Sequence, residues 1–182
     1  MPKIFLSDSN IFYKDCHQRV ERAAALCAQY GFDCFHPLRS NFHAQAGMAP
    51  PQMAAAICQN NLKELDACDI LLAQLDPFRG HEPDSGAVFE CGYMFAKGKP
   101  VYGYVADTQK SYCQRYPVKT FDREDGVYRD EQGRRIEEFS LPVNLMLGVP
   151  VHIVTGGIED ALRQIAADWK AQGIDGNADC VK

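Results

Sequence analysis

Two acidic side chains, six residues apart, carry the strongest chemical signal in the sequence. Asp84 and Glu90 lie in the segment DPFRGHEPDSGAVFE, which runs from Asp76 to Glu90 and holds four carboxylates. A carboxylate stabilises the oxocarbenium-like transition state of glycosyl transfer and can trap C1′ as an ester, while a second acid protonates the departing group. The pair therefore indicates glycosyl transfer, with Glu90 as the nucleophile and Asp84 as the second catalytic acid.

The position of Glu90 depends on a helix that we expect over residues 87–97, after a loop over 76–86. Glu90 then lies in the first turn, where the positive end of the helix dipole keeps it ionised. A plainer interpretation stays open, in which Asp84 only caps the helix and Glu90 is a solvated acid. We expect Val88, Cys91, Gly92 and Phe95 to form the buried stripe of this helix. Glu90 lies outside this stripe and can therefore point towards the cleft.

Strands and helices are expected to alternate along the chain. Short apolar runs predict strands over 3–6, 32–36, 70–75, 101–105 and 149–154. Amphipathic patterns predict helices over 15–30 (capped by Asp15), 52–65, 87–97 and 158–172, and one helical turn at 141–147. This alternation is typical of an α/β fold, and we predict a flavodoxin-like, five-stranded parallel sheet of order 2-1-3-4-5 with helices on both faces.

Ligands of such sheets bind beyond the carboxyl ends of the strands. That rule gathers Ser7–Phe12, Asp76–Glu90 and the segment after Val105 into one neighbourhood. We expect a single domain over 1–182. Its polar segment 106–140 is longer than the frame needs and is expected to form a lid or an interface, and 173–182 a loose tail.

Composition excludes several other classes of protein. The net charge of −5, without a basic run, disfavours a nucleic-acid partner, because phosphate binding needs clustered Lys and Arg. No apolar stretch approaches the ~20 residues of a membrane span, and no signal peptide opens the sequence, so we expect a cytoplasmic protein. The eight cysteines are dispersed. We therefore expect reduced thiols and neither a zinc site nor a disulfide scaffold.

Several motifs resemble the nucleoside 2-deoxyribosyltransferase family. The resemblance runs over about 57–105 and resumes at 140–170. The matching segments are Asp69–Gly80, with its Pro-Phe-Arg-Gly loop, then Glu82–Gly86, Phe89-Glu90, Gly92-Tyr93, Gly98–Val101 and Leu141–Leu147, together with the polar position Asn61.

The resemblance implies a flavodoxin-like subunit that forms at least dimers and exchanges the bases of 2′-deoxynucleosides by ping-pong transfer, without metal or cofactor. Its partners would be deoxynucleosides and free nucleobases. Glu90 would carry the 2-deoxyribosyl group, and Asp84 would hold sugar hydroxyls and assist proton transfer. Asn144 would bind the sugar in the neighbouring subunit's site, and Asn61 would face the base.

Alternatives accompany these binding roles. Asn144 could simply cap a turn, and Asn61 could be a solvated helix residue. Phe12 could stack on a base or fill the core. The expected substrate-binding set also includes Ser7, Gly86 and Arg79, although we favour an Arg79 that pins its loop through Asp76 or Glu82.

One departure from the family leaves the base preference, and the sugar itself, open. The first strand of the family runs into an Ala-Gly-Pro-like turn, whereas this chain has Ser7-Asp8-Ser9-Asn10. These polar side chains either narrow the pocket or add hydrogen bonds to it.

Two rival functions remain. The first is a hydrolase of deoxynucleosides or their 5′-monophosphates, for which Ser7, Ser9, Arg79 and Ser85 could supply phosphate contacts. The second is a non-catalytic nucleotide-binding module. The presence of both Asp84 and Glu90 argues against that module, because a binder needs no charged nucleophile beneath C1′.

Overall fold

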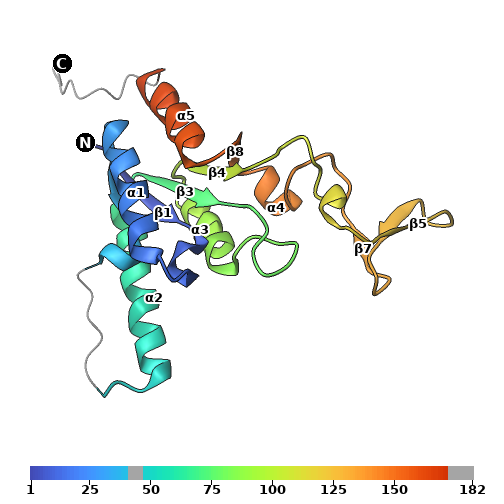
Figure 1. The fold of residues 1–182 in the computed structure, drawn as a ribbon, viewed down its shortest axis with the longest axis horizontal. Helices are drawn as coiled ribbons and strands as arrows, with labels where there is room; N and C mark the ends of the chain where they lie inside the picture. The colour runs from blue at the N-terminus through green and yellow to red at the C-terminus, as the bar shows by residue number, and fades with distance from the viewer. Residues whose placement is uncertain (41–46, 172–182) are drawn as a thin grey trace.

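The computed structural model describes residues 1–40 and 47–171 of the chain. Its main sheet holds five parallel strands in the order β2-β1-β3-β4-β8, so the predicted flavodoxin-like order 2-1-3-4-5 is confirmed (Figure 1). The strands are β1 (Lys3–Ser7), β2 (Asp33–Phe35), β3 (Ile70–Gln74), β4 (Val101–Val105) and β8 (His152–Thr155).

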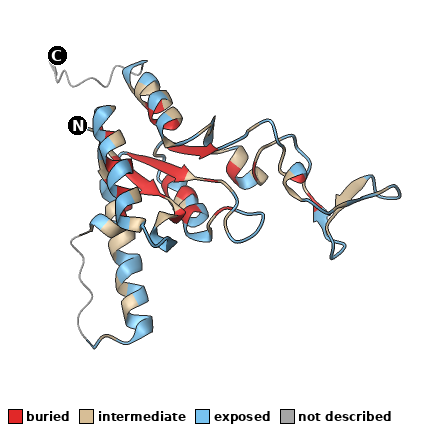
Figure 2. Ribbon diagram, in the orientation of Figure 1, coloured by how far each residue is buried: buried red, intermediate tan, exposed pale blue. Residues whose placement is uncertain are grey.

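Helices cover both faces of this sheet, because alternate strand residues point to opposite sides. Ile4 and Leu6 pack under one layer, whereas Phe5 packs under the other, and Figure 2 shows these strands as the buried centre. The first layer is formed by α1 (Cys16–Gln29) and α5 (Ile158–Ala171), and the second by α2 (Pro50–Ala67), α3 (Ser85–Ala96) and the short α4 (Leu145–Gly148).

Two expectations about the helices need correction. Asp15 precedes α1, but its carboxylate makes no cap hydrogen bond there and instead accepts one from Arg19 Nε at 2.8 Å. On α3 the buried residues are Ala87, Cys91 and Met94. Val88, Gly92 and Phe95, which we expected in the buried stripe, are exposed, since α3 contacts the sheet through a different face.

The segment 106–140 forms a small structure of its own. After the 3₁₀ turn η3 (Cys113–Arg115) come three antiparallel strands, β5 (Thr120–Asp122), β6 (Val127–Arg129) and β7 (Arg135–Ile136). Arg129 Nε binds Asp122 at 2.8 Å across the first hairpin. This sheet projects away from the main one, and its surface is largely exposed or half-buried (Figures 1 and 2).

The cysteines between Cys16 and Cys113 are free thiols, and Cys27, Cys68, Cys91 and Cys113 are buried. No helix within 1–40 and 47–171 is long and apolar enough to cross a membrane. The tail predicted at 173–182 lies outside the described residues.

Candidate active site

A pocket of about 300 Å³ opens where β1 ends and α3 begins. This volume is at the lower end of the range for small-molecule sites. The pocket lies beyond the carboxyl end of a central strand, where the fold is expected to bind ligands. It brings together six of the predicted site residues, namely Ser7, Phe12, Asn61, Asp84, Gly86 and Glu90.

Glu90 is half-buried in the wall of this pocket, and the Ser7 hydroxyl donates a hydrogen bond to its Oε2. The pKa of Glu90 is raised to about 7, mainly by burial and also by the charges of Asp84 and Asp8, while the Ser7 hydrogen bond acts in the opposite direction. Glu90 is the sixth residue of α3 and so lies beyond its first turn. The expectation that the helix dipole keeps Glu90 ionised is therefore wrong, and so is the alternative of a solvated acid.

Asp84 is the N-cap of α3. Its Oδ2 accepts hydrogen bonds from the backbone N–H groups of Gly86 at 3.0 Å and Ala87 at 3.3 Å. This cap starts the helix at Ser85, so Gly86 lies in its first turn instead of in the loop. A Cβ at position 86 would lie 2.9 Å from Asp84 Oδ2, and glycine therefore lets the carboxylate approach the helix end. Asp84 therefore caps α3 through Oδ2, and the cap does not use Oδ1.

Asp8 and His36 form a buried pair beside Glu90 that we did not predict. Leu38 N–H donates to His36 Nδ1 at 3.1 Å, so Nε2 carries the proton and donates to Asp8 Oδ1 at 3.3 Å. Burial alone would raise the pKa of Asp8, but His36 and the Asn10 N–H bring it below its ordinary value. The site therefore holds a carboxylate that stays ionised. The sequence held one signal for Asp8 as a site residue, because this acid directly follows the buried strand β1 at the edge where such sheets bind ligands.

Phe12 lines the pocket, and Phe78 and Arg79 of the following loop pack against its ring. Phe12 is 47% exposed and stacks on Phe78 with 5.2 Å between ring centroids, so it does not fill the core. The Arg79 guanidinium lies 4.6 Å from the Phe12 ring and 4.7 Å from the Phe78 ring.

The expectation that Arg79 pins the loop through Asp76 or Glu82 is wrong for the described chain. No ion pair joins Arg79 to either acid there, because both have other donors. Asp76 Oδ1 accepts from Ala106 N–H at 3.0 Å, and Glu82 accepts from the Tyr112 hydroxyl.

The two predicted asparagines lie in different places. Asn61 is half-buried on α2 and lines the Glu90 pocket. Asn144 caps α4, where its Oδ1 accepts from Met146 N–H at 2.9 Å, and lines a separate, largely apolar pocket of about 510 Å³. That pocket also contacts Val88 and Phe95 on α3. In this chain, Asn144 and Glu90 therefore line different pockets.

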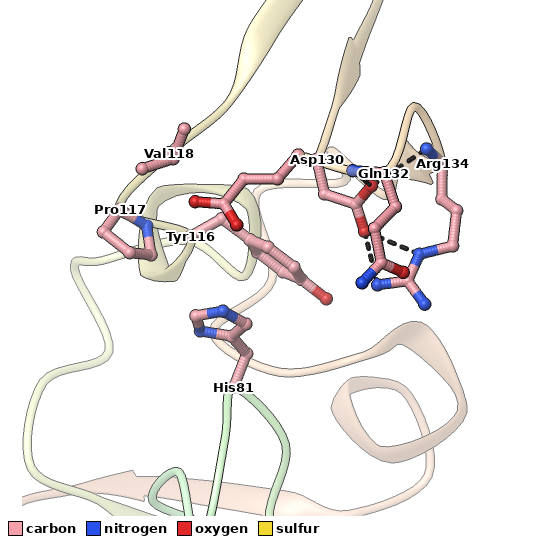
Figure 3. Close-up of a pocket in the computed structure, with 8 residues that line it drawn as sticks. His81, Tyr116, Pro117, Val118, Asp130, Gln132 and Arg134 are labelled. Atoms are coloured by element: carbon pink, nitrogen blue, oxygen red, sulfur yellow. Dashed lines mark hydrogen bonds and ion pairs between the residues drawn. The ribbon is translucent and has the colours of Figure 1, made fainter.

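A smaller hollow, of about 150 Å³, separates the 76–84 loop from the projecting sheet. Figure 3 shows His81 from the loop pointing towards Tyr116, with 4.4 Å between the two ring centroids. Across the hollow, Arg134 binds Asp130 within its own hairpin. The hollow lies apart from the Glu90 pocket, and its contacts tie segment 106–140 to the loop.

Charge limits what the Glu90 pocket can bind. Three carboxylates line it, from Asp8, Asp84 and Glu90, and no Lys or Arg among the described residues does so. Within residues 1–40 and 47–171, no group of three His, Cys, Asp or Glu side chains is placed to hold a metal ion. The arrangement suits a neutral, hydroxyl-rich ligand whose reaction develops positive charge.

Comparisons with known proteins agree with this geometry. The family model described as nucleoside 2-deoxyribosyltransferase matches residues 4–146. A solved 2-deoxyribosyltransferase from Leishmania mexicana is similar, with a TM-score of 0.72 and 26% identity, over 92% of this chain and 98% of that one. A conserved protein from Enterococcus faecalis shares the fold, with a TM-score of 0.59 and 20% identity, over 92% of this chain and 99% of that one.

A curated relative matches over a shorter range. An uncharacterized protein of Schizosaccharomyces pombe is 30% identical over 112 residues, which are 59% of this chain and 51% of that protein. The chain thus spans about half the length of the curated relative that it matches.

Proposed function

Because the chain belongs to the nucleoside 2-deoxyribosyltransferase family, we propose that it moves the 2-deoxyribosyl group of a deoxynucleoside from one base to another through an ester on Glu90. The observation that carries the proposal is the placement of Glu90. Ser7 holds its carboxylate in the pocket wall, and Asp84 and the ionised Asp8 lie nearby. Negative charge around one nucleophile favours an oxocarbenium-like transition state.

The reaction divides into two half-reactions that use the same groups. Glu90 attacks C1′ as the bond from C1′ to the base nitrogen breaks, and the departing base takes the bonding electron pair and a proton from the solvent. A second base then attacks C1′ with its ring nitrogen, loses its proton, and displaces Glu90 as a free carboxylate. Because the Ser7 hydroxyl binds the charged form of Glu90, it orients the nucleophile and favours its release.

The remaining pocket residues suit binding of the two parts of the substrate. Asp84 Oδ1 can accept from a sugar hydroxyl, since the helix cap uses only Oδ2. Asn61 offers an amide to the polar edge of the base. Phe12 offers an exposed ring against which a base can stack. Gly86 has no side chain, and it therefore lets the Asp84 carboxylate approach the N-terminus of α3.

A second copy of the chain would complete the site by contributing Asn144. The surface around Asn144 is apolar and exposed, with Phe95 56% and Met146 73% accessible, as expected of a subunit interface. An interface there would bring the Asn144 side chain next to the partner subunit, where its amide can bind the sugar of the partner's substrate. We therefore propose a homo-oligomer with shared sites.

The pocket favours deoxynucleosides over their 5′-monophosphates, because its three carboxylates would repel a phosphate. Arg79, the cationic candidate for a phosphate ligand, lies over Phe12 and Phe78 instead. Hydrolysis would use the same ester, with water in place of the second base, so product analysis must separate it from transfer.

The test is an incubation of purified protein with deoxyinosine and excess adenine, resolved by chromatography, with Glu90→Ala as the matched control. Deoxyadenosine and hypoxanthine, absent from the control, support transfer. Hypoxanthine with free deoxyribose and no new nucleoside means hydrolysis instead. If neither product forms, and pyrimidine deoxynucleosides also stay unchanged, the proposed function is wrong.

A further inference from the structure

A carboxylate of segment 106–140 holds the Asn144 amide in place. Asn144 Nδ2 donates to Glu137 Oε1 at 2.9 Å, and Leu145 N–H donates to Glu137 Oε2 at 3.1 Å. Asn144 Oδ1 meanwhile accepts from Met146 N–H. Together these bonds fix the rotation of the amide, and they leave one N–H and one lone pair of Asn144 free for a ligand.

The chain between these two residues is also tightly held. Arg115 Nε donates to the Pro142 carbonyl at 2.6 Å, and Tyr112 N–H donates to the Leu141 carbonyl at 2.7 Å. Ser140 adopts a left-handed φ of +56°, which turns the chain back between Glu137 and Asn144. A non-glycine residue keeps such a backbone only where its surroundings enforce it.

The same segment contacts the loop that leads to Asp84. The Tyr112 hydroxyl donates to Glu82, and Tyr116 packs against His81. Segment 106–140 is thus attached at one end to the loop of its own Glu90 pocket and at the other to Asn144.

We propose that Glu137 is a positioning residue that acts through Asn144 on the sugar bound in the partner subunit's site. This inference rests on the proposed function and on sharing of the site. A charge-assisted pair of hydrogen bonds gives the asparagine one orientation before the substrate arrives, so that binding costs less entropy. Segment 106–140 would then serve to present Asn144.

The test compares Glu137→Ala and the milder Glu137→Gln with Asn144→Ala in the base-exchange assay. The control is Glu138→Ala, a neighbouring glutamate that accepts from Ser111 at 3.4 Å and from Cys113 and makes no hydrogen bond to Asn144. Both Glu137 variants should raise KM for the deoxynucleoside, with Glu137→Ala losing about tenfold or more in kcat/KM. Glu137→Ala should cost little more once Asn144 is already alanine, because the two act as one unit. Full, independent losses in the double variant would overturn the proposal.

The activity of mixed oligomers then tests in which subunit's site Glu137 acts. A Glu137→Ala chain keeps its nucleophile, and a Glu90→Ala chain keeps an intact Asn144, so one site of each mixed dimer should be whole. Activity above the mean of the two parents supports the proposal. If Asn144→Ala mixed with Glu90→Ala recovers activity but Glu137→Ala does not, Glu137 does not act through Asn144.

The control reactions distinguish failure of the proposed function from failure of the proposed role of Glu137. If the wild-type chain exchanges no base, the proposed function fails and the role of Glu137 fails with it. If the wild-type chain is active and Glu137→Ala matches Glu138→Ala in KM and kcat, only the role of Glu137 is overturned.

Discussion

The Ser7 hydroxyl donates a hydrogen bond to Glu90 Oε2, and it joins the end of β1 to the second turn of α3. This contact opposes the burial and the neighbouring acids that raise the pKa of Glu90 to about 7. The nucleophile is therefore poised near neutrality, where a small change in its surroundings alters its charge.

Ser7→Ala should move the ascending limb of the pH–rate profile to higher pH, by roughly one unit. Only ionised Glu90 attacks C1′, and loss of the donor raises its pKa, so the charged fraction at neutral pH falls. The measurement is kcat/KM for base exchange across pH. Ser9→Ala is the matched control, since Ser9 is buried in the same segment but contacts Gln74. An unchanged limb in Ser7→Ala would contradict this role.

Asp8→Asn should shift the same limb in the opposite direction, towards lower pH. It removes a negative charge that raises the pKa of Glu90, while an amide oxygen can still accept from His36 and Asn10. His36→Ala should instead destabilise the fold by about 2 kcal/mol, because Asp8 loses a buried donor. Chemical denaturation and the pH–rate profile together check both outcomes. A shift to higher pH in Asp8→Asn would refute the assigned electrostatics.

Glu90→Gln should lower turnover by roughly a thousandfold or more, yet stabilise the folded protein above neutral pH. Between the ordinary pKa of 4.5 and the folded value of about 7, the folded state binds more protons than the unfolded state. The free energy of unfolding of the wild type therefore falls as pH rises through this window, whereas glutamine does not titrate. Denaturant unfolding near pH 5 and pH 8 should show the advantage of Glu90→Gln growing with pH, and an equal difference at both would count against it.

Two substitutions of Asp84 should separate its capping role from its proposed chemistry. Asp84→Ala removes the cap of α3 and should cost about 1 kcal/mol of stability as well as activity. Asp84→Ser retains a side-chain oxygen for the Gly86 N–H, so it should keep the stability but lose the carboxylate offered to the sugar. Thermal melting and kcat/KM report the two effects. Full activity in Asp84→Ser would mean that Asp84 only caps the helix.

The sequence alone determined the sheet order and the placement of the Glu90 pocket. Apolar runs and their spacing are local properties, and parallel strands with helical crossovers leave few topologies, so the order 2-1-3-4-5 and the binding edge followed. The types and spacing of Asp84 and Glu90 likewise indicated glycosyl-transfer chemistry before any geometry was known.

Tertiary packing decided the electrostatics of that site and the partners of its residues. Asp8 meets His36 only because β1 and β2 are neighbours, and neither side chain signals a pairing across 28 residues. Arg79 lies over aromatic rings because Asp76 and Glu82 are engaged elsewhere. The raised pKa of Glu90 arises from burial, which depends on every element around the pocket, whereas a helix position read from sequence captures only the local dipole. Side-chain identity is thus set by the sequence, but proton affinity and contact are set by the fold that surrounds each group.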